Sequence, residues 1–347
     1  MRYIQYDSVS KMVAIQVENL VMTYGDGTKA VKGISFGVDE GEFFGFLGPN
    51  GAGKSTTIKI LTTLLRKTSG SVKVAGHDVE HDAQTIRKLI GVQMQDTVID
   101  EDLTGRENLM LQGHLQSLHG EDLRTRVNEL LKIVDLEEAA NKRAAYYSGG
   151  MKKRLDLAST LVHQPRLLFL DEPTTGLDPQ TRATVWSYLK QLNQEQGITI
   201  FITTQYLEEV DRLCRRLAIL DHGEIVAKGS PAELKQEIGA DAITLGFGNG
   251  TTGNGTAREK AKQILTGLSG VTNIVDADGG VVVYAKNGGF MVPDIVRAFD
   301  GANIQLSSIG VSTPTLDDVF LKHTGRRIRP EELDKSRGSG RMFSRRR

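Results

Sequence analysis

A glycine-rich loop with the sequence GPNGAGKS, from Gly48 to Ser55, constrains the fold of this 347-residue chain more than any other feature. The apolar stretch 42–47 before it is expected to be a strand, and residues 54–65 after it a helix. Glycines let the backbone wrap tightly, so that successive N–H groups and the helix N-terminus converge on a polyanion. The pattern G-x-x-x-x-G-K-[ST] in this context predicts a phosphate-binding loop. A glycine turn with an incidental lysine would rarely match every specified position between a strand and a helix.

Three side chains at the end of this loop have predicted roles. Lys54 is expected to reach the β- and γ-phosphates of a nucleotide, while the Ser55 hydroxyl binds Mg²⁺ and Thr56 supports the α/β-phosphate region. The sequence therefore predicts a nucleoside triphosphate with Mg²⁺ as the ligand.

A second motif supplies two carboxylates. The apolar stretch 167–171 is expected to be a buried strand that carries Asp171 to the carboxyl edge of the sheet, where ligands of open α/β sheets bind. Asp171 would hold Mg²⁺, directly or through water, and Glu172 would orient or deprotonate the attacking water. The two motifs together predict a P-loop nucleotidase, a description that kinases, helicases and GTPases would also fit.

A third motif, Ser148-Gly149-Gly150, precedes a predicted helix. A serine N-cap followed by exposed N–H groups makes a second anion site. The nucleotide at Lys54 needs no second site in the same chain, but the nucleotide of a second protomer does.

These motifs, in this order, resemble the ATP-binding-cassette family, whose LSGGQ-type motif is matched at its central Ser-Gly-Gly. Tyr147 replaces the usual leucine and Met151 the usual glutamine, and the anion-binding atoms are unchanged. The resemblance implies that Tyr24 stacks on adenine and that Gln95 contacts Mg²⁺ and faces a transmembrane partner. Gln93 lies two residues earlier, and Gln95 is preferred by its spacing from 90–91.

Two further positions follow from the resemblance. The loop 176–179, which contains Asp178, matches the one that contacts the opposite protomer near the nucleotide. Gln205 stands where the family usually has a histidine that bonds the γ-phosphate. Glutamine keeps a donor and an acceptor but carries no positive charge, so hydrolysis is expected to remain possible.

The resemblance thus implies ATP and Mg²⁺ as cofactors and a head-to-tail dimer with two ATP molecules between the protomers. The catalytic residues would be Glu172, Gln205 and Lys54, and the metal ligands Ser55, Gln95 and Asp171. The nucleotide-binding residues would be Tyr24, Gly48, Pro49, Asn50, Gly51, Ala52, Gly53, Lys54, Ser55, Thr56, Gln95, Ser148, Gly149, Gly150 and Asp178.

Three segments are similar in sequence to the daunorubicin/doxorubicin-resistance type of ATP-binding subunit: 147–158, 203–209 and Pro314–Phe320. That similarity covers residues 14–325 and implies an ATPase that powers a separate multi-span permease, exporting drugs or other hydrophobic, lipid-like compounds. The name of a subgroup does not establish the substrate.

Alternating strands and helices predict an α/β fold: a P-loop ATPase domain with an inserted helical subdomain, plus a small C-terminal α+β domain. We expect an N-terminal extension at 1–13, the ATPase domain at 14–239 with its helical subdomain at about 96–160, and a ferredoxin-like domain at 240–324. Early strands are expected at 14–21 and 35–37, and residues 82–136 are expected to be mostly helical. Residues 325–347 form a tail with nine basic and three acidic side chains, which is predicted to be disordered.

Composition and the N-terminal residues indicate the cellular compartment of the protein. Apolar runs are shorter than the ~20 residues that span a bilayer, the first ten residues do not read as a secretory signal, and the single cysteine, Cys214, fits a reducing compartment. We therefore expect a cytoplasmic protein, held at the cytoplasmic face of the membrane by the permease. The basic tail could bind an anionic membrane or nucleic acid, or only aid solubility.

Two other functions stay open at this point. One is a non-transport cassette ATPase that acts on nucleic acid or ribosomes, although such proteins generally carry two cassettes or long coiled coils. The other is a regulatory module with a structural nucleotide site, which intact Lys54, Asp171 and Glu172 oppose.

Overall fold

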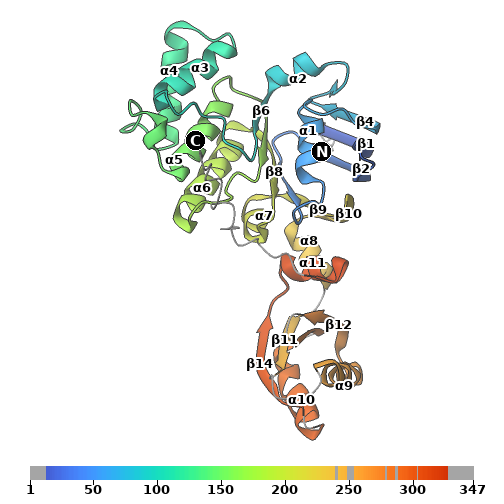
Figure 1. Cartoon of the computed structure of the whole chain (residues 1–347). Helices are drawn as coiled ribbons and strands as arrows, with labels where there is room; N and C mark the ends of the chain where they lie inside the picture. Colours follow the sequence, from blue (N-terminus) through green and yellow to red (C-terminus); the bar gives the residue numbers. More distant parts are fainter. Residues whose placement is uncertain are drawn as a thin grey trace, which may run out of the picture.

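The computed structural model describes residues 13–238, 241–247, 254–277, 280–285, 288–302 and 304–326, without the side chains of 254–257 and 277. Figure 1 shows a larger α/β body, which contains the first ten strands, and a smaller body near the end of the chain. Three predicted segments lie mostly or nearly entirely outside the described residues: the N-terminal extension at 1–13, the glycine-rich loop 246–255 and the basic tail 325–347.

A six-stranded sheet forms the centre of the larger body, in the order β10-β9-β3-β8-β7-β6. Neighbouring strands are parallel except for the β9–β10 hairpin. All residues of β3 and β7 are buried, as expected for parallel strands that are covered on both faces. The strands are β3 (Phe43–Leu47), β6 (Ile90–Gln93), β7 (Leu167–Asp171), β8 (Thr199–Thr204), β9 (Arg216–Asp221) and β10 (Glu224–Gly229).

A second, antiparallel sheet has the order β2-β1-β4-β5. Its strands are β1 (Val13–Thr23), β2 (Lys29–Asp39), β4 (Ser69–Val74) and β5 (His77–Asp78). The predicted strand at 35–37 was too short, since β2 spans eleven residues and pairs along β1. Apolar side chains of this sheet, such as Ile15 and Phe36, share a core with α1 (Lys54–Leu61) and with Phe44 and Phe201 of the central sheet.

Helix α1 ends four residues earlier than predicted. Thr63 has a left-handed backbone, with a φ of 64°, and a β-branched residue in that conformation stops an α-helix. The loop from Gly48 and the first turns of α1 are as predicted.

The inserted helices are α3 (Gly105–Leu115), α4 (Gly120–Ile133) and α5 (Gly149–Thr160), preceded by α2 (Ala83–Leu89). Thr104 begins α3 with a capping box to Glu107, and α4 buries Leu123, Val127 and two leucines at helical spacing. The prediction of a mostly helical segment from 82 to 136 missed β6. This four-residue apolar run pairs with β7 and is too short to show a periodicity of its own.

Three helices complete the larger body: α6 (Pro179–Gln196), α7 (Leu207–Leu213) and α8 (Pro231–Ile238). No helix among the described ranges is long and apolar enough to cross a membrane.

The smaller body has the strand–helix–strand–strand–helix–strand order that the sequence predicts. Its antiparallel sheet has the order β12-β13-β11-β14, and one apolar core joins the sheet to both helices. The elements are β11 (Asp241–Phe247), α9 (Asn254–Thr266), β12 (Val271–Ala277), β13 (Gly280–Ala285), α10 (Gly288–Gly301) and β14 (Leu306–Ser312).

The last described helix, α11 (Leu316–Thr324), lies between the two bodies in Figure 1. It packs on α8, and its Val319 and Phe320 belong to the same buried core as Leu234 and Ile238. On its other side, the Tyr284 hydroxyl of β13 donates a hydrogen bond to Asp318 Oδ1 (3.3 Å). Helix α11 therefore connects the small sheet to the larger body.

Candidate nucleotide site

The glycine-rich loop joins β3 to α1, and two of its glycines are required by its geometry. Gly51 and Gly53 have φ angles of 80° and 105°, which side-chain-bearing residues rarely adopt. A Cβ atom at Gly53 would also lie 2.5 Å from the carbonyl oxygen of Ala30, and one at Gly48 would lie 2.5 Å from that of Leu220. The loop is therefore closely wrapped by the neighbouring backbone.

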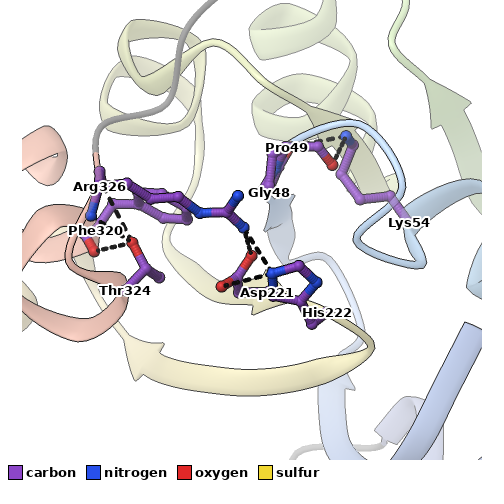
Figure 2. A network of polar contacts seen from close by, with 8 residues as sticks. All are labelled: Gly48, Pro49, Lys54, Asp221, His222, Phe320, Thr324 and Arg326. Atoms are coloured by element: carbon purple, nitrogen blue, oxygen red, sulfur yellow. Dashed lines mark hydrogen bonds and ion pairs between the residues drawn. The ribbon is translucent and has the colours of Figure 1, made fainter.

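Lys54 is only 4% exposed, and its ammonium group lies within the loop. Its Nζ donates to the carbonyl oxygens of Gly48 (2.7 Å) and Pro49 (3.1 Å), as Figure 2 shows. It also forms an ion pair with Glu172 Oε1 at 3.0 Å. The two residues that the sequence assigns to phosphate binding and to water activation are thus direct partners in this structure.

Asp171 lies at the carboxyl end of β7, where it is 1% exposed. Its Oδ1 accepts hydrogen bonds from Ser55 Oγ (3.2 Å) and from the Thr203 hydroxyl. Mg²⁺ binds through oxygen atoms and commonly takes only one or two protein ligands beside phosphate and water. The adjacent Ser55 hydroxyl and Asp171 carboxylate fit that donor set.

Glu172 has an unusual backbone for its residue type, with a φ of 51°. Left-handed non-glycine residues cost about 1–3 kcal/mol and cluster at functional sites. Its N–H donates to the carbonyl oxygen of Thr203 (3.0 Å), and its Oε2 accepts from the Thr175 hydroxyl (3.2 Å). These bonds fix the strained residue and aim its carboxylate at Lys54.

Two other predicted residues lie at the edges of this loop. The exposed Tyr24 hydroxyl is 3.1 Å from the hydroxyl of Thr56, so the aromatic ring lies beside the start of α1. Gln205 follows β8 and is 6% exposed. The carbonyl oxygen of the preceding Thr204 accepts from the Gly48 N–H (3.3 Å), which brings the Gln205 segment to the phosphate loop.

The two glutamines after β6 differ in their surroundings. Gln93 is buried and its amide donates to Asp156 Oδ2 (3.0 Å), and burial raises the pKa of that carboxyl group. The Gln95 side chain is exposed, and the backbone carbonyl oxygen of Gln95 accepts from Lys153 Nζ (2.7 Å). Gln93 is therefore engaged in the interior, while Gln95 faces outward.

Ser148 is the N-cap of α5, where its Oγ accepts from the Met151 N–H (3.2 Å). Ser148 and Gly149 are exposed, and a Cβ atom at Gly149 would meet nothing within 4 Å. Helices α5 and α1 lie on opposite sides of the central sheet in Figure 1. Within the ranges that the structure describes, no hydrogen bond or ion pair joins the Ser-Gly-Gly segment to the Lys54 loop.

Asp178 lies near this exposed segment. Its carboxylate caps α6 by accepting from the Gln180 and Thr181 N–H groups, and the Thr181 hydroxyl donates to Oδ2 (2.6 Å). The bonds from Thr181 lower the pKa of Asp178. A Cβ atom at Gly150 would lie 3.0 Å from the Thr181 side chain. The two features assigned to the opposite protomer are therefore neighbours on one face.

Sequence reasoning missed Glu209, a fully buried residue of α7. Its Oε1 accepts from the Thr174 hydroxyl (2.9 Å) and the Trp186 indole N–H (2.8 Å), and burial raises its pKa. Glu209 links the helix that follows Gln205 to the loop that follows Glu172. Its partners are 35 and 23 positions away, so no local pattern pointed to it.

A phosphate loop, a buried carboxylate pair and a separate serine-capped helix define the class of this protein as a P-loop ATPase of the cassette type. The chain belongs to the ABC transporter family: the family profile matches residues 31–175, and the profile of the ATP-binding protein DrrA1-3-like, C-terminal domain matches residues 229–324. It is an ATP-hydrolysing subunit, as the sequence predicted.

Curated relatives are similar over most of the chain. The daunorubicin resistance ATP-binding protein DrrA3 of Streptomyces coeruleorubidus is 42% identical over 90% of this chain and 96% of that protein. The linearmycin resistance ATP-binding protein LnrL of Bacillus subtilis is 37% identical over 91% of this chain and 99% of its own length.

Solved cassettes are similar to 62–66% of the chain. The dimeric, post-hydrolysis cassette MJ0796 with ADP and Pi is 30% identical, with a TM-score of 0.58 over 62% of this chain and 98% of that one. CbiO1 of Clostridium perfringens, part of an ABC transporter complex, is 32% identical, with a TM-score of 0.60 over 66% of this chain and 94% of its own. These matches confirm the predicted fold class.

Proposed function

We propose that this chain powers a separate multi-span permease that exports drugs or other hydrophobic, lipid-like compounds. The names of its relatives support this reading, because they describe resistance to daunorubicin, doxorubicin and linearmycin, and export of Nod factor. The chain would then sit at the cytoplasmic face of the membrane through its permease. The observation that carries the proposal is the combination of an intact Lys54–Asp171–Glu172 site with similarity to these exporters along nearly the whole chain.

At the site, Ser55 and Asp171 would hold Mg²⁺, which neutralises phosphate charge when bound. Tyr24 would stack on the adenine ring, and Gln95 would contact the metal region from the exposed side. The proximity of the Ser55 and Asp171 oxygens and the outward position of the Gln95 side chain support these roles.

The ion pair between Lys54 and Glu172 suggests how ATP prepares its own hydrolysis. A γ-phosphate would replace the carboxylate as the partner of the Lys54 ammonium group, because both anions compete for one buried cation. Glu172 would then be released to accept a proton from the attacking water. Gln205 would hydrogen-bond the γ-phosphate from the adjacent end of β8.

Two copies would associate head to tail, so that Ser148 and Asp178 of one copy cover the nucleotide held by the other. The exposed Ser-Gly-Gly segment supports this arrangement, because the N-terminus of α5 presents anion-binding N–H groups to the outside. ATP would favour the closed dimer through its contacts with both copies, and ATP hydrolysis would let the two copies separate.

The permease would dock where the helical block meets the central sheet. A groove of about 330 Å³ there is lined by polar residues of the surrounding helices and by apolar side chains, and the apolar ones include Leu64, Met94 and Val98. Leu64 and Val98 are 61% and 83% exposed, and exposed apolar residues that group together on a surface are typical of a binding site for another protein. Met94, which lines this groove, is adjacent to Gln95 in the chain, so a docked partner would be close to the nucleotide site.

Co-purification tests the proposal first. A multi-span membrane protein bound to the chain would support transport, while bound nucleic acid would favour the alternative of a nucleic-acid or ribosome ATPase. The decisive experiment reconstitutes the chain with that permease and follows ATP-dependent movement of drug-like and lipid compounds. The Glu172→Gln variant should lower turnover about 10²–10⁴-fold and stop transport. Equal transport by this variant would remove Glu172 from the catalytic role.

A further inference from the structure

The turn between β9 and β10 connects the phosphate loop to the end of the described chain. Its Gly223 N–H donates to the carbonyl oxygen of Ala52 (3.0 Å) within the phosphate loop. The carbonyl oxygen of Leu220 lies against Gly48, so closely that a Cβ atom there would be 2.5 Å away. The end of β9 and the turn that follows it therefore contact the start and the middle of the glycine-rich loop.

This turn has the backbone of a tight two-residue hairpin. His222 and Gly223, with φ angles of 47° and 84°, lie between the paired residues Asp221 and Glu224, and positive φ at both central residues is typical of the favoured hairpin turn. The Gly223 carbonyl oxygen accepts from the Lys32 N–H (2.9 Å), which fixes one side of the turn to β2. The other side carries the side chains of Asp221 and His222.

Arg326, just after α11, holds that other side. Its guanidinium donates to Asp221 Oδ1 (2.6 Å) and lies 3.0 Å from His222 Nε2. The Arg326 side chain is half exposed, but the Asp221 carboxylate is only 12% exposed. Figure 2 shows this contact in the same close view as Gly48, Pro49 and Lys54.

The position of Arg326 is set by α11 and by the small domain behind it. Gly325 ends α11 in a left-handed conformation with a φ of 73°. The Thr324 hydroxyl accepts from the Arg326 N–H (3.4 Å), and it donates to the carbonyl oxygen of Phe320 (2.8 Å). Phe320 is fully buried, and Asp318 of the same helix is bonded to Tyr284 of the small sheet.

We propose that Arg326 is a positioning residue for nucleotide binding: through Asp221 it holds the β9–β10 turn, and the turn holds the phosphate loop. The C-terminal domain thereby tunes the affinity for ATP through α11. This inference rests on the proposed nucleotide site, and it gives the C-terminal domain a role beyond packing.

The test measures the Kd of the full chain for a fluorescent ATP analogue in the presence of Mg²⁺. R326Q and D221N should each raise Kd about two- to fivefold, the size expected for a partly exposed ion pair. The double variant should have a Kd no higher than either single variant, because both substitutions remove the same contact.

R326K should keep most of the affinity, and the effect of R326Q on Kd should shrink at 1 M salt. R297A, which breaks the exposed pair with Asp294 in the small domain, is the matched control and should not change Kd.

Each outcome decides something. An unchanged Kd in R326Q and D221N, with or without a lower melting temperature, would make the contact merely structural and overturn the inference. Effects that add in the double variant would do the same. Lys54→Ala is included in parallel: if it bound the nucleotide like the wild type, the site assignment itself would be wrong, whatever Arg326 does.

Discussion

The two halves of the proposed ATP site differ in how complete they are within one chain. In the half around Lys54, called the buried half below, the ammonium group is enclosed and is bonded to Gly48, Pro49 and Glu172. The half around Ser148 is exposed, and the hydrogen bond that Ser148 Oγ accepts caps its own helix. The first half is therefore preorganised by folding, whereas the second is an outward-facing surface that needs another molecule to act on.

The largest expected effect lies in the buried half. Lys54→Ala should lower ATP turnover by about 10²–10³-fold, because it removes a buried cation aimed at the phosphates. Lys59→Ala, on the exposed side of the same helix, should leave turnover unchanged. Steady-state phosphate release measures both, and near-normal turnover in Lys54→Ala would contradict the role given to the loop.

A smaller effect is expected in the exposed half. Ser148→Ala and Thr104→Ala each remove the N-cap of a helix in the inserted block, and each should cost about 1 kcal/mol of stability. Only Ser148→Ala should also weaken ATP-dependent dimerisation, by about tenfold, because it alone loses a bond to phosphate. Melting curves and sedimentation measure the two quantities. Equal dimerisation in both variants would leave Ser148 with a capping role only.

The smallest effect concerns Gln205, which borders the buried half. In Gln205→His, the pH–rate profile should gain one inflection above ~6.5, because a γ-phosphate favours the protonated imidazole. The wild type has no imidazole at this position and should lack that inflection. In Gln205→Ala, turnover should fall, and full turnover would show that Gln205 has no contact with the γ-phosphate.

The buried half was the more predictable from sequence, because its chemistry is local. A strand, a loop and a helix that are contiguous in the chain set the positions of Gly48, Lys54 and Ser55. What could not be predicted is how distant segments meet. The Lys54–Glu172 ion pair and the Arg326–Asp221 contact join residues more than 100 positions apart, and the side chains alone do not specify such pairings.

The same reason explains the elements that were missed. Strand β6 is four residues long and is defined by pairing with β7, and β2 extends well beyond the predicted stretch because β1 pairs along its length. Tertiary pairing, rather than local preference, fixes such strands. The C-terminal domain was predictable as a unit, since its alternation of strands and helices is regular over 241–312.

One measurement addresses the shared ATP site directly. Cysteines are placed at Asn50 and Gly149 in the Glu172→Gln background with Cys214→Ala; both chosen positions are exposed and Gly149 has open space around it. With Mg²⁺ and ATP, oxidation should link two chains through a disulfide between the phosphate loop of one and the α5 N-terminus of the other. Each single-cysteine chain should stay largely unlinked. A double-cysteine chain that remains monomeric at saturating ATP would contradict the head-to-tail arrangement.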